Sequence, residues 1–274
     1  MSVSGEPSGY DVPDWAAEPI KRFLSDTRRV QDITEISTHG IRALTMMPKL
    51  VNVLSKRTTG LLKADDAESA KELAELARRE VESGFPLVYA NAVVSLWSRL
   101  ESLVREFLVV WITKKPELLG AEPFSKLRIR LGEYVVLGEI DRGYYLVELL
   151  EQEIGAGIRN GVARFECLLK AIGLDGAVPS RLQRDMFEFG QVRTAVVHGG
   201  GKVDARLVGA CPWLGFEAGE DLIVSGSMFG RYGRGAGVYV CLLVGRVGEV
   251  FGVAGPELQA DMAEIIKEYE ESRA

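Results

Sequence analysis

Arg193 and His198 stand five residues apart near the end of a strongly helical stretch, and their side chains suit phosphodiester chemistry. An imidazole can accept and donate a proton near neutral pH. A guanidinium can hold a phosphate with two parallel hydrogen bonds and stabilise the charge that develops on it. Such a pair can cleave RNA without a metal ion. The chain has only one other histidine, His39, for which we expect a capping or surface role.

A helix expected over residues 180–198 must position this pair. Ser180 and Gln183 fit the S-x-x-Q capping box at its start. Three glycines from Gly199 onward should end it. On an ideal helix, which turns by about 100° per residue, Arg193 falls in the middle of an apolar stripe. The stripe consists of Leu182, Met186, Phe189, Val196 and Val197.

A guanidinium on an apolar stripe is costly unless it is paired. One solution is a carboxylate on a neighbouring helix, and Glu101, within the apolar stretch 87–112, is the candidate partner. The other is a stripe that faces a second subunit, which would place Arg193 in a cleft. His198 lies about 140° around the helix axis from Arg193. Either the glycines unwind the last turn and redirect His198, or a two-fold partner brings a second pair to the same place.

The remaining elements predict an all-α protein. Residues 127–136 alternate weakly and could hold a short strand, and residues 203–227 are expected to form a loop, so the fold has at most a small hairpin. Apolar spacings of three and four, with Gly and Pro at the boundaries, predict helices elsewhere. These helices span about residues 18–33, 41–57, 65–83, 87–112, 141–153, 160–172, 180–198, 228–251 and 256–271.

Composition excludes several classes of protein. The chain has 274 residues, of which 47% are apolar, and a net charge of −6 with no basic block, so any nucleic-acid contact must be local. No stretch of about 18 clean apolar residues predicts a membrane span, and no secretion signal begins the chain, so we expect a cytoplasmic protein. Three scattered cysteines form no C-x-x-C pair, and we expect no metal site and no cofactor.

With these elements in place, residues 85–260 resemble a HEPN domain, in particular its prokaryotic ribosomal-ligand-like group. The hallmark of that family is R-x(4–6)-H at the end of a long helix, which Arg193 and His198 match. Glu101 resembles an acidic position on the family's first helix. Further resemblance lies in the segments 161–169 with Gly173-Leu174, 200–204, Cys211-Pro212 and Gly219-Glu220-Asp221.

The resemblance implies a helical bundle that works as a homodimer, with the two motifs facing a shared cleft. Many members of the family are metal-independent endoribonucleases of toxin–antitoxin or phage-defence systems. Carried over, Arg193 and His198 would be the catalytic pair acting on RNA, with Thr194, Glu101, Gly199 and Gly200 in support. An antitoxin or another defence protein would be a possible partner, and no membrane is implied.

Two positions depart from the family pattern. Thr194 stands where Asn is common after the arginine, although its hydroxyl can still form a hydrogen bond. Gly200 stands where members paired with nucleotidyltransferase antitoxins carry Tyr, so control by modification of such a tyrosine is not expected. The missing Asn, the acidic charge and the 84 N-terminal residues that the resemblance does not explain motivate the alternative, a non-catalytic HEPN module that binds a nucleotide or a protein as a helical dimer.

The chain is expected to divide into three parts. Residues 1–14 form a polar tail that we expect to be disordered. Residues 15–84 form an N-terminal helical extension, which the resemblance does not explain. Residues 85–274 form the HEPN-like helical domain.

Overall fold

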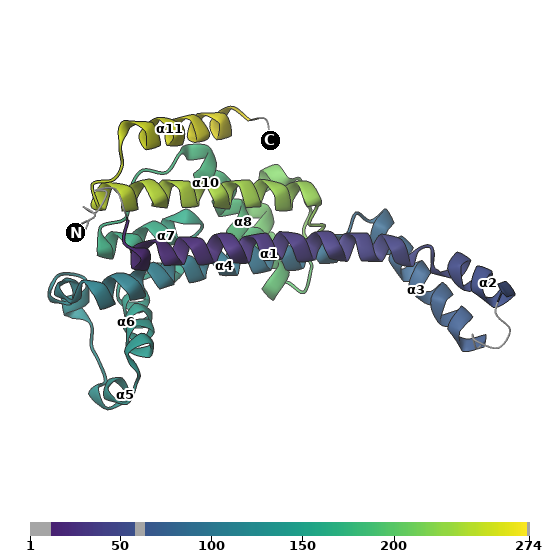
Figure 1. The fold of residues 1–274 in the computed structure, drawn as a ribbon, viewed down its shortest axis with the longest axis horizontal. Coiled ribbons are helices and arrows are strands. Elements are labelled where there is room, and N and C mark those ends of the chain that lie inside the picture. Colours follow the sequence, from purple (N-terminus) through teal and green to yellow (C-terminus); the bar gives the residue numbers. More distant parts are fainter. Residues whose placement is uncertain (1–11, 58–63, 273–274) are drawn as a thin grey trace, which may run out of the picture.

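The computed structural model describes residues 12–57 and 64–272, and within them the fold is all-α, as the sequence predicts (Figure 1). No strand occurs in these residues. The α-helices are α1 (Asp14–Leu44), α2 (Met47–Arg57), α3 (Ala64–Glu82), α4 (Pro86–Lys114), α5 (Leu131–Val135), α6 (Glu139–Glu153), α7 (Val162–Leu169), α8 (Ser180–His198), α9 (Ala205–Ala210), α10 (Gly226–Val250) and α11 (Pro256–Glu271). Short 3-10 helices span Pro116–Gly120, Phe124–Lys126, Ala156–Ile158, Lys170–Ile172 and Pro212–Leu214.

Helix α4 is the centre of the bundle and packs against α1, α6, α7, α8 and α10. Its apolar residues recur at spacings of three and four, and the ring of Trp97 lies between those of Phe165 on α7 and Phe189 on α8, at centroid distances of 5.3 and 5.0 Å. A Cβ atom at Gly190 would lie 3.0 Å from the Trp97 ring, so the glycine lets α8 approach α4 closely. This packing fixes the face of α8 that carries Arg193.

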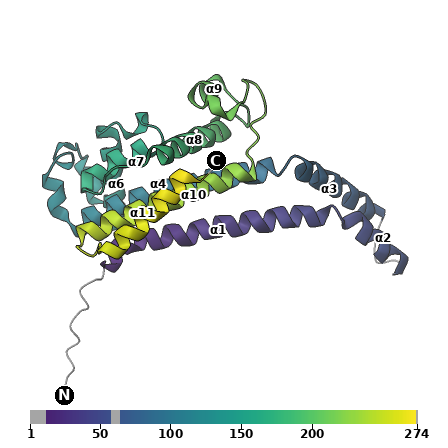
Figure 2. The ribbon, with the colours of Figure 1, turned by 90° about the horizontal axis from the view of Figure 1, so that it is seen from above.

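Helix α1 runs beside α4 for much of its length. Beyond the C-terminal end of α1, α2 and α3 form an arm that projects from the bundle (Figures 1 and 2). Ala16 and Phe23 of α1 belong to the main hydrophobic core. Residues 1–11 of the predicted tail lie outside the described residues. Helix α1 begins at Asp14, which is the last residue assigned to that tail. The division between a helical extension and a HEPN-like domain at residues 84 and 85 stays a prediction.

The structure corrects two details of the sequence analysis. No strand forms over residues 127–136, where the alternation is too short to define a sheet partner, and α5 forms there instead. The predicted loop 203–227 contains α9, because the side chain of Asp204 accepts a hydrogen bond from the backbone N–H of Leu207 at 2.8 Å and caps the helix. The only strand-like pairing in the described residues is one bridge between Lys202 and Asp221.

The start of α8 is also built differently from the prediction, although its bounds agree. Pro179 occupies the N-cap position, and Ser180 already lies inside the helix without a capping hydrogen bond. The side-chain amide of Gln183 donates instead to the carbonyl oxygen of Val178, at 2.7 Å. The capping box is therefore wrong, because the fixed backbone of proline starts the helix one residue earlier.

Among the described residues, no helix combines the length and the apolar character that a bilayer span would need.

Candidate functional site

Arg193 lies on the face of α8 that packs against α4, and its ion-pair partner there is Glu101, as the sequence predicts. The Nη2 atom of Arg193 is 3.7 Å from Oε2 of Glu101. That distance is an ion pair but too long for a hydrogen bond. The Arg193 side chain keeps 25% of its surface exposed. The guanidinium therefore lies at the edge of the core, paired loosely and still reachable from solvent.

Glu101 is shared between two arginines, and Arg164 of α7 holds it more closely. The Nη1 atom of Arg164 donates to Oε1 of Glu101 at 2.8 Å. The Nε atoms of Arg164 and Arg193 are both buried and have no hydrogen-bond partner among the described residues. Because the Arg193 side chain is partly exposed and its contact with Glu101 is longer than a hydrogen bond, an anion that reaches its exposed Nη groups can pair with it.

The charge network continues from Arg164 onto α6. Oε2 of Glu151 lies 4.0 Å from Arg164 and accepts from Nη2 of Arg105 at 2.7 Å. A second, parallel bond joins Nε of Arg105 to Oε1 of Glu151 at 2.8 Å. This hydrogen bonding raises the pKa of the Arg105 guanidinium above its ordinary value. Three arginines and two glutamates thus alternate across α4, α6, α7 and α8, which leaves one net positive charge in an acidic protein.

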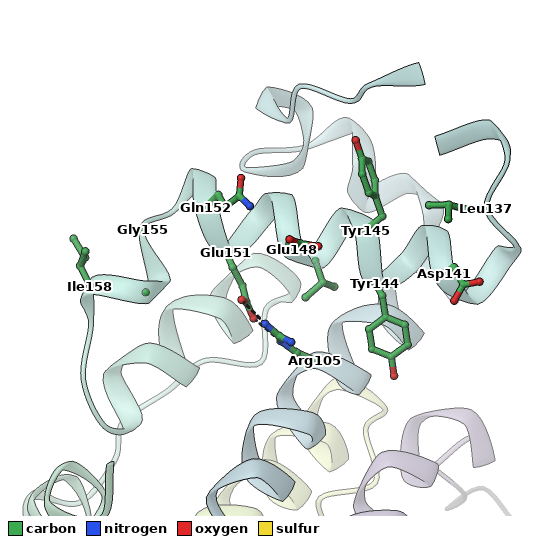
Figure 3. Close-up of a pocket in the computed structure, with 12 residues that line it drawn as sticks. Arg105, Leu137, Asp141, Tyr144, Tyr145, Glu148, Glu151, Gln152, Gly155 and Ile158 are labelled. Carbon is green, nitrogen blue, oxygen red and sulfur yellow. Dashed lines mark hydrogen bonds and ion pairs between the residues drawn. The ribbon is translucent and has the colours of Figure 1, made fainter. Parts of the chain in front are cut away.

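A hollow of about 890 Å³ lies beside the Arg105 end of this network (Figure 3). Its size is within the range of small-molecule sites. Three carboxylates line it, those of Asp141, Glu148 and Glu151, against the single cation of Arg105. That charge balance disfavours a phosphate. The Arg193 end of the network differs, because there a partly exposed arginine lies beyond hydrogen-bond distance of its carboxylate partner.

His198 is the last residue of α8, and its side chain is exposed. That side chain makes no hydrogen bond and no ion pair within the part of the chain that the structure describes. The helix is not unwound before it, because the backbone N–H of Gly199 still donates to the carbonyl oxygen of Ala195 at 2.8 Å. The separation of about 140° from Arg193 therefore persists, and one chain by itself does not bring the two side chains together.

Near the C-terminal end of α8, the buried face of the helix contains fewer residues than the predicted apolar stripe. Leu182, Met186 and Phe189 are fully buried, whereas Val197 is 46% exposed. At this end α8 contacts α9. Ala195 still belongs to the main core and Val196 packs against it, whereas Val197 and His198 are exposed.

Three of the proposed supporting residues, Thr194, Gly199 and Gly200, act mainly on the backbone conformation of α8 and of the turn that follows it. The Oγ1 atom of Thr194 donates to the carbonyl oxygen of Gly190 at 2.8 Å, so its hydroxyl is engaged within its own helix. A Cβ atom at Gly199 would lie 2.8 Å from the carbonyl oxygen of Lys202, and Gly200 has a φ of 58°. Both glycines make the sharp turn that leaves His198 at a helix end.

Sequence reasoning missed a buried carboxylate on the same helix. Glu188 is 1% exposed and accepts hydrogen bonds from Nε1 of Trp213 at 2.6 Å and from the hydroxyl of Tyr232 at 2.7 Å. Arg231 of α10 forms an ion pair with it. This cluster fastens α10 and the loop after α9 to α8.

Two further clusters repeat the combination of a carboxylate with a tyrosine. Glu166 of α7 accepts from the hydroxyl of Tyr239 at 2.8 Å and from Nη1 of Arg246 at 2.9 Å. Asp185 of α8 accepts from the hydroxyl of Tyr269 at 2.6 Å. The signal in the sequence is an acidic residue among apolar residues of a helix, which is the same signal that predicts a cationic partner for Glu101. In all three clusters the carboxylate accepts a hydrogen bond from a tyrosine hydroxyl inside the bundle, which indicates a structural role, although Nε of Arg231 is buried without a partner among the described residues.

Within the described residues, no group of three or more His, Cys, Asp or Glu side chains could hold a metal ion. Cys167, Cys211 and Cys241 are all free thiols. Burial, followed by the charge of Glu188, raises the pKa of the Cys211 thiol to about 12. Cys211 is therefore a packed core residue rather than a nucleophile.

The chain matches no protein-family model, no curated protein and no solved structure.

Proposed function

We propose that the protein is a metal-independent endoribonuclease of HEPN type, acting in the cytoplasm in a toxin–antitoxin or phage-defence system. RNA would be cleaved at a cleft between two copies of the chain, by Arg193 and His198. The observation that carries this proposal is the state of Arg193. Its guanidinium is partly exposed, its Nε is buried without a partner, and its nearest carboxylate lies beyond hydrogen-bond distance.

The chemistry assigns one role to each side chain. His198 removes the proton of a ribose 2′-hydroxyl, whose oxygen then attacks the neighbouring phosphorus. Arg193 holds the phosphate and stabilises the charge that develops on its oxygens. The bond from phosphorus to the 5′-oxygen breaks, and that oxygen takes up a proton from the imidazolium of His198, which returns to its neutral form. The products are a 2′,3′-cyclic phosphate and a 5′-hydroxyl.

A dimer is part of the proposal because of the geometry of α8. Arg193 and His198 point in directions about 140° apart on the same helix. Two copies related by a two-fold axis could place the exposed His198 of one beside the Arg193 of the other. RNA would then contact the protein mainly in the cleft, and with a net charge of −6 its binding should be weak and sensitive to salt.

The angle of about 140° between Arg193 and His198 also favours a second candidate function, a non-catalytic HEPN module. In that case the Arg164, Glu101 and Arg193 cluster is structural, and the helical dimer binds a nucleotide or a protein partner. The engagement of Thr194 with its own helix is consistent with this alternative.

Induced expression in cells distinguishes the two candidates. The strains would carry the wild type, Arg193→Ala, His198→Ala or His39→Ala, the last as a control that removes the only other histidine. A nuclease arrests growth and fragments total RNA in the wild type and in the His39 control, and both effects disappear in the other two variants. Growth arrest that persists in both of those variants would favour the binding module instead.

A further inference from the structure

Helix α6 and the segments at its two ends form a strongly acidic surface. Residues 131–158 contain six acidic residues and one basic residue, so they carry −5 of the chain's net charge of −6. Asp141 and Glu148 are exposed, and neither forms a hydrogen bond or an ion pair with the rest of the described chain. Glu151 differs, because Arg105 already holds it through two hydrogen bonds. Asp141 and Glu148 are therefore free to pair with an added cation.

These two free carboxylates lie on one face of a single helix. They are seven residues apart, which is about two turns of α6 and about 10 Å along its axis. The opposite face of the helix is packed into the core, where Leu150 is fully buried. The carboxylates thus form a spaced pair at a fixed separation on the outward side of a rigid element.

The hollow of about 890 Å³ runs along this outward face (Figure 3). An apolar side chain lines each end, Leu137 before α6 and Ile158 after it. Ile158 is 87% exposed, and Tyr144, which lines the hollow between them, is 40% exposed. Large apolar side chains that stay exposed around a hollow indicate an interaction surface. The groove is therefore acidic along its middle and apolar at both ends.

We propose that this groove docks a basic amphipathic helix of a partner protein. The helix lies alongside α6, and two of its lysines or arginines, seven residues apart on one face, pair with Asp141 and Glu148. Because both helices rise by about 1.5 Å per residue, the two pairs of charges have the same separation. Apolar residues nearer the two ends of the docked helix pack on Leu137 and Ile158.

Charge complementarity selects this occupant. A nucleic acid or an anionic lipid would meet the carboxylates of Asp141, Glu148 and Glu151 against the single cation of Arg105, and would be repelled. A small polyamine would neutralise the carboxylates but would leave Ile158 exposed to water. A basic helix with apolar residues at its ends satisfies both parts of the surface.

The proposal is independent of the proposed nuclease. The groove contains neither Arg193 nor His198, and its occupant is a different protein rather than a second copy of the chain. A dimer formed through α8 is therefore compatible with it, and RNA cleavage is not needed to test it.

Fluorescence anisotropy of a synthetic peptide with the full chain tests the proposal. The probe is a fluorescein-labelled, alanine-rich helix of about 18 residues, with two lysines seven residues apart and a leucine near each end of the same face. The wild type should bind it with a dissociation constant below about 100 µM at about 50 mM salt. The same peptide with glutamates in place of the two lysines should not bind.

Charge reversal on the protein tests the pairing. Asp141→Lys and Glu148→Lys should each raise the dissociation constant by at least about tenfold. Glu153→Lys is the matched control, because it makes the same change of charge on an exposed residue of α6 outside the groove. The double variant with both groove substitutions should bind the glutamate peptide instead. Circular dichroism of each variant checks that the helices form.

Three results would overturn the proposal. The first is a wild type that does not bind the lysine peptide at about 1 mM. The second is an equal loss of binding in the Glu153→Lys control, which would mean that the peptide follows only the net charge. The third is spermidine that binds as tightly as the peptide and is lost in the same two variants, which would assign the groove to a small polycation.

Discussion

Arg193 lies 3.7 Å from the carboxylate of Glu101, while Arg164 holds the other oxygen of that carboxylate at 2.8 Å. Glu101 thus forms ion pairs with two arginines, and its contact with Arg193, the arginine of the motif, is the longer one. The Nε atoms of both arginines are buried without a partner among the described residues, so the imbalance lies in their Nη contacts with Glu101. An arginine that is held in place but poorly satisfied can bind a phosphate without first breaking a strong ion pair.

This imbalance predicts unequal coupling energies. Double-mutant cycles with Glu101→Gln should give about 1 kcal/mol for the pair with Arg164 and less than about 0.5 kcal/mol for the pair with Arg193. The arginines are changed to Ala, and the free energy of unfolding is measured in urea. A larger coupling for Arg193 than for Arg164 would mean that Arg193 is mainly a structural ion-pair residue.

The geometry of α8 predicts complementation between inactive variants. If the arginine of one copy works with the histidine of the other, a mixture of Arg193→Ala and His198→Ala chains contains heterodimers with one intact pair. After exchange of subunits, the mixture should regain about a quarter of the wild-type RNA cleavage rate. A mixture as inactive as its two components would show that each pair comes from a single chain.

The buried carboxylate of Glu188 predicts a large loss of stability on neutralisation. Glu188→Gln leaves Arg231 without its counter-charge in a largely buried position, which should cost about 3–5 kcal/mol of the free energy of unfolding. Glu148→Gln, on an exposed residue of α6, should change that energy by less than about 0.5 kcal/mol. Equal urea midpoints for the two variants would contradict the role given to the cluster.

Three buried tyrosines predict a loss of stability in alkali. Burial, followed by the neighbouring carboxylates, raises the pKa of Tyr232, Tyr239 and Tyr269 above the ordinary value. Because these hydroxyls ionise more easily in the unfolded chain, the stabilisation is complete below about pH 10 and is lost as the pH rises further. Each tyrosine contributes a slope of about 1.4 kcal/mol per pH unit in that range.

Urea unfolding between about pH 8 and pH 11, with tyrosinate absorbance, measures this effect. Tyr239→Phe should flatten the dependence on pH, since one raised pKa is removed. Tyr134 is only partly buried and lies outside the three clusters, and Tyr134→Phe is the control. A stability that stays constant up to about pH 11 would show that these hydroxyls ionise in the folded protein.

The sequence predicted those parts of the site that depend on one helix or on one rule. The end of α8 agrees because the glycines from Gly199 are a local signal, whereas its start agrees although Pro179, and not the predicted capping box, begins the helix. The partner of Arg193 could be predicted because Glu101 is an acidic residue in a long apolar helix, where a carboxylate needs a cation. The weak alternation over residues 127–136 was misleading because it had no turn or second strand to pair with.

Other features depend on contacts between distant segments and could not be predicted. Arg164 pairs with Glu101 only because α7 packs against α4, and no local sequence pattern near either residue predicts that contact. The partners of Glu188 come from α10 and from the loop after α9. The relation of His198 to Arg193 within a cleft depends on a second copy of the chain.

The most direct test of the proposed function is cleavage of RNA by the purified full-length chain in excess EDTA. The wild type and His39→Ala should produce fragments that end in a 2′,3′-cyclic phosphate and begin with a 5′-hydroxyl. Arg193→Ala and His198→Ala should lower the rate by at least about a hundredfold. Intact RNA after incubation with the wild type, or equal cleavage by all four proteins, would contradict the account.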